Sequence, residues 1–286
     1  SQAIKNPLSH RYKAACLINA RNKIALTGTP IENGTFDLFA QMSFANRGFF
    51  GGVQKFRENY STPIDKDGNE IIAGELNKII NPFVLRRTKE NVASELPDKT
   101  EDIIYCEMED GQRRVYDAYR NEYRNQLLNK IDSEGIGKSK MMVLEALTRL
   151  RQICDSPVLL NSDEITETQS VKIKEIVRHI TDKTGKHKIL VFSQFVKMLG
   201  LIQDELAKLD IEYEYLDGQC STQQCEKSVN NFQENENMRV FLISLKAGGT
   251  GLNLTAADYV YIVYAWWHPA VETKAIDRSD RIGEDK

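Results

Sequence analysis

The segment VFLISLKAGGTGLNL, residues 240–254, decides the fold of this chain. Its first five residues, VFLIS, are apolar enough to form a strand that is buried on both faces, as strands of parallel sheets are. The glycine-rich residues 246–254 follow that strand directly, so they lie at the carboxyl edge of the sheet, where α/β proteins bind ligands. The segment therefore predicts an α/β fold with a glycine-rich loop at the end of a buried strand.

Strands and helices alternate along the neighbouring sequence. Strand-like apolar runs occupy residues 188–195, 211–216 and 259–264, and apolar residues at helical spacing occupy 173–180, 199–209 and 222–232. Strands separated by helices imply right-handed crossovers and a parallel sheet. We therefore expect an α/β core over residues 170–286, with a parallel sheet flanked by helices.

The middle of the chain predicts two helices. Apolar residues recur every four positions over 112–131 and every three positions, as leucines, over 141–153, and both spacings are helical. Between them, two glycines stand among polar residues and predict a flexible surface turn over 132–140. We expect a helical insertion over residues 110–160.

The N-terminal region offers too little sheet for a complete domain. Residues 23–26 predict one strand, which leads into Thr27–Pro30, and helical segments are expected around 37–44 and 74–80. The proline-bearing, charged segment 95–101 is the expected domain boundary. We therefore divide the chain into residues 1–97 and residues 98–286.

Composition excludes several classes of protein. The 286 residues are 41% hydrophobic and 28% charged, as in ordinary globular proteins. No apolar run approaches the roughly 18 residues of a membrane span, and residues 1–9 lack the apolar core of a signal peptide. The five cysteines form no CxxC pair, which suggests neither a disulfide framework nor a zinc ribbon. We expect no membrane partner and no metal held by this chain's own residues.

The charge balance argues against nucleic-acid binding by bulk charge, because the net charge is -3 and the pI is near 5.9. Any such contact must therefore be local. One basic run, residues 1–30, contains no acidic residue. This run fits either a local nucleic-acid surface or a solvated face. Its cations are Lys5, Arg11, Lys13, Arg21 and Lys23.

The glycine-rich loop is the first candidate site. Gly248, Gly249 and Gly251 would let the main chain approach a phosphate closely. Thr250 and Asn253 stand beside them as hydrogen-bonding partners. A plain tight turn is the alternative, although such a turn would need only one or two glycines.

Two arginines form the second candidate site. Arg278 and Arg281 lie three residues apart, which places both on one face of a helix. Their planar, permanently charged groups suit phosphate oxygens, and phosphoryl transfer gains most of its rate from such charges. With Asp277 and Asp280 they would equally make a surface ion-pair ladder, and the spacing alone leaves both interpretations open.

Two further features give weaker signals. The tripeptide Gly-Lys-Ser at 137–139 resembles the end of a phosphate loop, but Asp132 stands where the GxxxxGK[ST] spacing requires glycine. Trp266 and Trp267 are adjacent, so they do not both point into one core. The displayed indole either stacks on a base or caps the core.

Taken in chain order, seven segments resemble the motifs of the Swi/Snf family of helicase superfamily two. The resemblance runs nearly from end to end, and seven ordered matches are far more specific than any one of them. The segments are QAIKNP (2–7) after the second motif, LTGTPIEN (26–33) at the third, PFVLRRTKENV (82–92) leading out of the first lobe, LRQICDSP (150–157) at a helix end, KILVFSQF (188–195) at the fourth, SLKAGGTGLNL (244–254) at the fifth and AIDRSDRIG (275–283) at the sixth.

The resemblance implies a motor of two RecA-like lobes, with ATP and Mg²⁺ between them and double-stranded DNA across both. Residues 1–97 would be the end of lobe one, and residues 98–286 would be lobe two. Arg278 and Arg281 match the catalytic arginines that reach the γ-phosphate, and Gly249 and Gly251 would also contact the nucleotide. The implied DNA contacts are Lys246, Gly248, Thr250, Asn253, Trp266, Arg86 and Arg87, and the implied coupling residues are Thr27, Gly28, Thr29 and Gln194.

The implied activity is that of a DNA-dependent ATP hydrolase, which couples hydrolysis to movement on DNA or to remodelling of complexes with nucleosomes or RNA polymerase. The phosphate loop and the metal-binding Asp-Glu pair would lie upstream of Ser1. We therefore expect this fragment alone to be inactive. We expect a bacterial cytoplasmic protein, or a nuclear one if the source is eukaryotic. The alternative is a non-catalytic DNA- or protein-binding module with a remodeller-like surface.

Four positions depart from the family pattern. Lys274, Asp280 and Glu284 stand where the family commonly has Gln, His and Gln, and Cys225 stands where it generally has Arg. Both arginines of the sixth motif remain. The chain stops soon after that motif, so the helix that braces the two lobes is expected to lie outside it.

Overall fold

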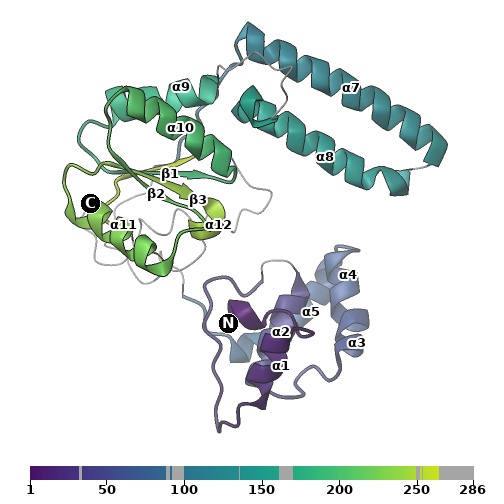
Figure 1. Cartoon of the computed structure of the whole chain (residues 1–286). Helices are drawn as coiled ribbons and strands as arrows, with labels where there is room; N and C mark the ends of the chain where they lie inside the picture. Colours follow the sequence, from purple (N-terminus) through teal and green to yellow (C-terminus); the bar gives the residue numbers. More distant parts are fainter. Residues whose placement is uncertain are drawn as a thin grey trace. The chain divides into compact units, whose positions relative to one another are not determined.

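The computed structural model describes residues 1–31, 34–87, 91, 100–134, 136–160, 170–248, 252 and 254–263. The chain divides into two compact units, Ser1–Ser94 and Glu95–Lys286 (Figure 1). In this described part, no helix is both long and apolar enough to span a membrane.

The second unit contains a parallel sheet of four strands. These are β1 (Ile189–Ser193), β2 (Tyr213–Leu216), β3 (Val240–Ser244) and β4 (Tyr259–Ile262). Their order is β2-β3-β1-β4, and every neighbouring pair is parallel. All four strands lie within the predicted runs, so the structure confirms the α/β fold class.

Strand register places three strand ends at one level. Ser193 of β1 lies opposite Ser244 of β3, and Phe192 lies opposite Ile262 of β4. The residues that follow β1, β3 and β4 therefore leave the sheet side by side at its carboxyl edge. This edge is where parallel α/β sheets bind ligands.

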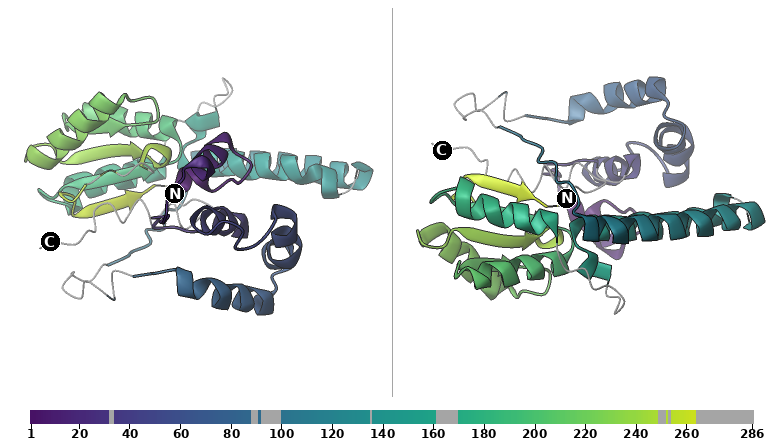
Figure 2. Two further views of the ribbon diagram at one scale, coloured as in Figure 1. Left: turned by 90° about the horizontal axis from the view of Figure 1, so that it is seen from below. Right: turned by 90° about the horizontal axis from the view of Figure 1, so that it is seen from above.

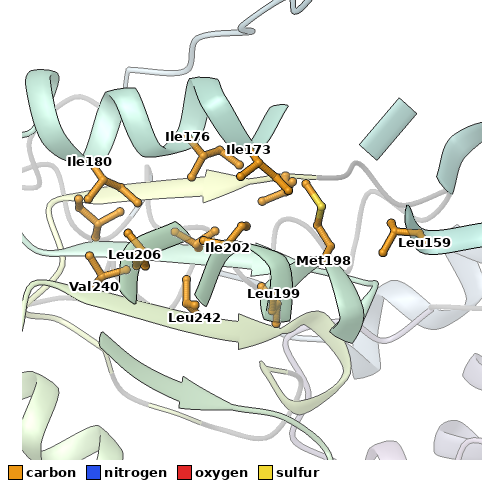
Figure 3. Close-up of a cluster of buried hydrophobic side chains, with 13 residues drawn as sticks. Leu159, Ile173, Ile176, Ile180, Met198, Leu199, Ile202, Leu206, Val240 and Leu242 are labelled. Atoms are coloured by element: carbon orange, nitrogen blue, oxygen red, sulfur yellow. The ribbon is translucent and has the colours of Figure 1, made fainter. Parts of the chain in front are cut away.

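Helices cover both faces of the sheet. Successive strand residues point to opposite faces, and the central strands β1 and β3 are apolar at alternate and intervening positions, so both faces are buried. The helices α9 (Val171–Arg178), η5 (His179–Lys183) and α10 (Val196–Lys208) cover one face. The helices α11 (Thr222–Glu234) and α12 (Leu245–Gly248) cover the other (Figure 1). Figure 3 shows the first layer, where Ile202 and Leu206 of α10 pack over Val240 and Leu242.

Two long helices, α7 (Asp110–Glu134) and α8 (Ile136–Asp155), form the predicted insertion. They lie side by side and project away from the sheet (Figure 2). A short 3₁₀ helix, η4 (Pro157–Leu160), follows them. The break between the two helices is shorter than the predicted surface turn over 132–140, because α7 continues to Glu134 and α8 begins at Ile136. Gly137 costs only about 1 kcal/mol in a helix, which the surrounding helix formers offset.

The leucines whose spacing predicted α8 do not mark the side of the helix that packs. Leu144 and Leu147 are exposed at 53% and 36%, whereas Ala146 and Ile153 are buried. Helical periodicity therefore identified the helix but not the side of it that packs.

The first unit is helical in its described residues, and a cluster of apolar side chains forms its core. Phe56 lies at the centre of that core, 5.0 Å from Phe39 and 4.8 Å from Phe50 between ring centroids. Both predicted helical segments are confirmed, as α2 and α5. The elements are η1 (Gln2–Ile4), α1 (His10–Leu17), α2 (Thr35–Ala45), α3 (Val53–Phe56), η2 (Arg57–Ser61), α4 (Thr62–Asp65), α5 (Glu70–Ile80) and η3 (Asn81–Phe83).

The predicted strand at 23–26 is wrong. These residues form neither strand nor helix, and Ile24 and Leu26 are 78% and 82% exposed. A strand needs a hydrogen-bonded neighbour, and the described residues of this unit include no other strand. Instead, the carbonyl of Leu26 accepts hydrogen bonds from the amino terminus and hydroxyl of Ser1, at 3.3 and 3.0 Å.

Candidate nucleotide and DNA site

The carboxyl edge of the sheet brings the fourth and fifth motif segments together. At the end of β1, the hydroxyl of Ser193 accepts a hydrogen bond from the backbone N–H of Phe195 at 3.2 Å. At the end of β3, the hydroxyl of Ser244 accepts from the backbone N–H of Ala247 at 3.3 Å. Each serine thus turns the chain immediately after its strand. Gln194 and the start of the glycine-rich loop consequently lie next to each other.

Gln194 has a half-buried side chain at this edge. Its amide oxygen Oε1 is buried and has no hydrogen-bond partner in the described part of the chain. Burying a polar atom without a partner costs about 1–3 kcal/mol. Such an atom at a ligand-binding edge is the kind of group that a ligand or a moving loop satisfies.

The glycine-rich loop is anchored at both ends in one apolar cluster. Ala247 before the loop is 8% exposed and Leu254 after it is fully buried, and both pack under α11. Lys246 and Gly248 belong to the short helix α12. The other predicted residues of this region, Gly249, Thr250, Gly251, Asn253, Trp266, Arg278 and Arg281, lie outside the described residues, as do the departures Lys274, Asp280 and Glu284.

Thr27, Gly28 and Thr29, the predicted coupling residues, lie in an irregular segment of the first unit. The hydroxyl of Thr27 accepts a hydrogen bond from the backbone N–H of Thr29 at 3.1 Å, which forms a small turn. Thr27 and Gly28 are exposed. A Cβ atom on Gly28 would meet nothing within 4 Å, so this glycine leaves room for a partner without being required by the local packing.

Sequence reasoning missed the side chains that fasten this segment. The ammonium group of Lys5 donates a hydrogen bond to the carbonyl of Thr29 at 2.7 Å. Nε2 of Gln41 donates to the carbonyl of Pro30 at 2.6 Å. Lys5 is only 7% exposed, so it does not belong to a solvated basic face. Gln41 was recognisable as the one amide within the apolar sequence of α2.

The other basic side chains near these segments are more accessible. Arg86 and Arg87 follow η3 and are exposed, and Nη1 of Arg87 donates to the carbonyl of Arg86 at 3.3 Å. In the basic run, Arg11, Lys13 and Arg21 are exposed as well. All of these side chains can therefore reach an anionic partner.

An ion pair between a buried carboxylate and a half-buried lysine ties the helical insertion to the sheet, and sequence reasoning missed it. Asp155 at the end of α8 is fully buried, and its Oδ1 lies 2.7 Å from the ammonium group of Lys172 in α9. Lys172 also donates to the carbonyl of Val263, directly after β4, at 3.3 Å. Burial raises the pKa of Asp155 to about 6, and the positive charge of Lys172 opposes that rise.

Cys225 begins the second turn of α11, at the position where an arginine was expected. It is half-buried and packs against the cluster under α11. Burial raises the pKa of its thiol. All five cysteines are free thiols.

Two protein families match the chain. The SNF2-related domain matches residues 1–159, and the helicase conserved C-terminal domain matches residues 171–283. The Bacillus subtilis protein YwqA, whose name places it among ATP-dependent helicases and translocases, is 36% identical over 293 residues, which cover 100% of this chain and 31% of YwqA. The TATA-binding protein-associated factor MOT1 of Saccharomyces cerevisiae is 29% identical, over 99% of this chain and 18% of MOT1.

Solved structures give the same result. The Sulfolobus solfataricus SWI2/SNF2 ATPase core in complex with dsDNA is 37% identical, with a TM-score of 0.55, and the match covers 100% of this chain and 60% of that chain. The C-terminal domain of a Sulfolobus solfataricus SWI2/SNF2 ATPase is 35% identical, with a TM-score of 0.50, over 59% of this chain and 74% of that chain. The chain spans less than a third of the length of the two relatives above. Because the SNF2-related match alone covers more than half of the residues, the chain belongs to the SNF2 (Swi/Snf) family of ATP-dependent helicases and remodellers.

Proposed function

We propose that this chain is part of an ATP-driven translocase that acts on double-stranded DNA. One observation carries the proposal: β1 and β3 end side by side, and the chain at each of these ends belongs to a segment that resembles a helicase motif, the fourth and the fifth. That edge is where a parallel sheet presents loops to a ligand. In the proposed division, residues 1–97 are the end of lobe one and residues 98–286 are lobe two.

ATP lies between the lobes in this proposal. Arg278 and Arg281 reach its γ-phosphate, where planar cationic groups stabilise the charge of phosphoryl transfer. Gly249 and Gly251 let the backbone approach the nucleotide. Mg²⁺ and most of the triphosphate are held by a phosphate loop and an Asp-Glu pair, and residues 1–286 contain no GxxxxGK[ST] sequence.

DNA is held through its phosphates. Lys246, Gly248, Thr250 and Asn253 contact one strand, and such contacts position the protein without reading bases. The Sulfolobus solfataricus structure, 37% identical to this chain, contains dsDNA, which supports the choice of a duplex. The exposure of Arg86 and Arg87 fits contacts to the same partner, and Trp266 is proposed to stack against DNA.

Coupling between ATP and DNA is proposed for Thr27, Gly28 and Thr29 in the first unit and for Gln194 in the second. The amide oxygen of Gln194 has no hydrogen-bond partner among the described residues, which supports this role, because a coupling group needs a partner that it gains and loses. The work performed is movement on DNA or remodelling of a complex with nucleosomes or RNA polymerase. The setting is the bacterial cytoplasm, or the nucleus if the source is eukaryotic.

The test is ATP turnover by the full-length protein, with and without duplex DNA. We expect DNA to stimulate turnover, and Arg278→Ala or Arg281→Ala to lower it by about 10³-fold, as loss of an arginine finger does, with little change in DNA affinity. Arg178→Ala is the matched control, because Arg178 is exposed and its guanidinium group pairs with Glu175 of the same helix, α9. If both arginine variants keep turnover within threefold of wild type, the surface-ladder interpretation is right.

A second outcome would favour the other class of function. A full-length protein that binds DNA but shows no turnover above buffer would be a non-catalytic module with a remodeller-like surface. A motor and a non-catalytic module are both compatible with the length, composition and motif order of this chain. The turnover measurement therefore separates them.

A further inference from the structure

Among the described residues, side chains from outside the segment hold Thr27–Pro30. Within it, the structure gives one local hydrogen bond, from the backbone N–H of Thr29 to the hydroxyl of Thr27. Two hydrogen bonds from outside the segment reach consecutive carbonyls: Lys5 donates to that of Thr29 at 2.7 Å and Gln41 to that of Pro30 at 2.6 Å. The position of this segment therefore depends on two side chains that lie distant in sequence.

Burial of Lys5 costs free energy, because it removes a charged ammonium group from water. Its side chain is 7% exposed, and lysine is almost never this buried unless its charge is compensated. Asp37, also 7% exposed, supplies a negative charge that raises the pKa of Lys5, although burial has the larger effect and lowers it. The lysine thus contributes a charge-assisted hydrogen bond, which is roughly twice as strong as a neutral one.

Gln41 connects the same segment to the apolar core. Its Nε2 donates to the carbonyl of Pro30 and also to the carbonyl of Asp37 at 3.0 Å. Both Asp37 and Gln41 belong to α2, whose neighbouring residues Leu38 and Phe39 are buried in the core of the first unit. A displacement of α2 would therefore move Pro30. Lys5, whose charge is attracted to Asp37 of the same helix, would carry Thr29 along with it.

We propose that Lys5 is a positioning residue for coupling: its ammonium group holds the carbonyl of Thr29 so that Thr27–Pro30 moves as one body with α2. This inference rests on the proposed function, because that function assigns coupling to Thr27–Thr29. Lys5 touches neither nucleotide nor DNA in this proposal. It acts through the backbone of the segment.

The experiment compares the full-length protein with Lys5→Met, which keeps the length of the side chain but removes its charge and donors. Turnover is measured at saturating ATP with and without duplex DNA, together with the KM for ATP and the DNA affinity. We expect DNA stimulation to fall by about tenfold, which is an ordinary size for coupling between sites. The basal rate, the KM for ATP and the DNA affinity should each stay within threefold. A purely structural lysine would lower all activities together.

Hydrogen exchange gives a readout that does not depend on activity. We expect the backbone amides of residues 26–31 to exchange faster in Lys5→Met than in wild type, whereas those of β3 should be unchanged. Lys66→Met is the control for both measurements, because Lys66 is an exposed lysine of the same unit. Gln41→Leu removes the second anchor and should act in the same direction. That variant carries the test if Lys5→Met does not fold.

The possible failures are distinguishable. Normal DNA stimulation in Lys5→Met, together with unchanged exchange over residues 26–31, would overturn the positioning role and leave the proposed function intact. Absence of DNA stimulation in the wild-type protein would overturn the proposed function and the coupling role with it, whatever the exchange data show.

Discussion

The buried carboxylate of Asp155 makes the stability of this chain depend on pH in a direction opposite to that of most acidic residues. Its side chain is fully buried, and burial raises its pKa from 3.8 to about 6. Because the folded chain holds the proton more tightly than the unfolded chain, protonation of Asp155 stabilises the fold. This stabilisation is complete below pH 3.8 and is lost as the pH rises through about 6.

The magnitude follows from the two pKa values. A change of one pKa unit corresponds to about 1.4 kcal/mol, so a rise from 3.8 to about 6 corresponds to about 3 kcal/mol in total. Most folded proteins tolerate pH values from about 4.5 to 7.5. Over that interval, the titration of Asp155 lowers the free energy of unfolding by about 2 kcal/mol.

The variant Asp155→Asn removes the titration and keeps the shape of the side chain. We expect its free energy of unfolding, relative to that of wild type, to increase by about 2 kcal/mol as the pH rises from 4.5 to 7.5, because only wild type loses stability over this range. Urea denaturation of the 286-residue chain at several pH values measures this difference, in which the titrations of all other groups cancel. In Lys172→Met, the midpoint of the pH effect should move above 6, because Lys172 opposes the rise in the pKa of Asp155.

The control is Glu205→Gln. Glu205 and Lys208 are also 2.7 Å apart, but the carboxylate side chain is 43% exposed. An exposed pair contributes at most about 1 kcal/mol, so this variant should show little change with pH. If the difference between Asp155→Asn and wild type stays flat within about 0.5 kcal/mol across the series, Asp155 is not the buried titrating group described above, and the reasoning from burial fails.

Two further predictions concern the proposed motor. The 286-residue chain alone should release phosphate from ATP no faster than buffer, because it contains no GxxxxGK[ST] sequence; turnover that Arg281→Ala abolishes would contradict this. In the full-length protein, Lys246→Ala should weaken binding equally on unrelated duplexes and lower the slope of log affinity against log salt by about 1. Filter binding measures both effects, with the exposed Lys227→Ala as control, and a loss confined to one duplex would exclude a backbone contact.

The sheet could be predicted from the sequence because each of its strands carries its own signal. The five residues 240–244 form β3 with the bounds that were expected, since a strand covered on both faces must be apolar at every position. The same pattern located β1 and β4. Their alternation with helices then restricted the connections to parallel ones, which the register confirms.

Local sequence patterns do not predict structure that depends on a neighbouring element elsewhere in the chain. Residues 23–26 have strand-like composition, but no strand lies beside them among the described residues of the first unit. Leu144 and Leu147 have helical spacing, yet α8 packs through Ala146 and Ile153 instead. Periodicity shows that a helix has faces, and it leaves open which face meets a neighbour.

The polar contacts around the candidate site were unpredictable for a related reason. Lys5 and Thr29 are 24 residues apart, and Asp155 and Lys172 are 17 apart. Neither spacing is periodic, and each lysine looked like an ordinary surface cation in the sequence. The two acceptor carbonyls have different surroundings: Thr29 lies in the segment that resembles the third motif, and Val263 directly follows β4. Both lysines therefore donate to a backbone carbonyl, the buried Lys5 to that of Thr29 and the half-buried Lys172 to that of Val263.

This shared arrangement has a physical basis. Moving a segment out of a sheet ladder would break many hydrogen bonds at once, whereas moving it away from one side chain breaks one. A single buried lysine supplies one strong, charge-assisted bond to one carbonyl, which fixes a position while leaving the neighbouring backbone N–H groups available. The same reasoning explains why such anchors lie outside the motifs they serve: a residue that holds the loop from behind leaves the loop's own side chains, such as Thr27, exposed to the partner.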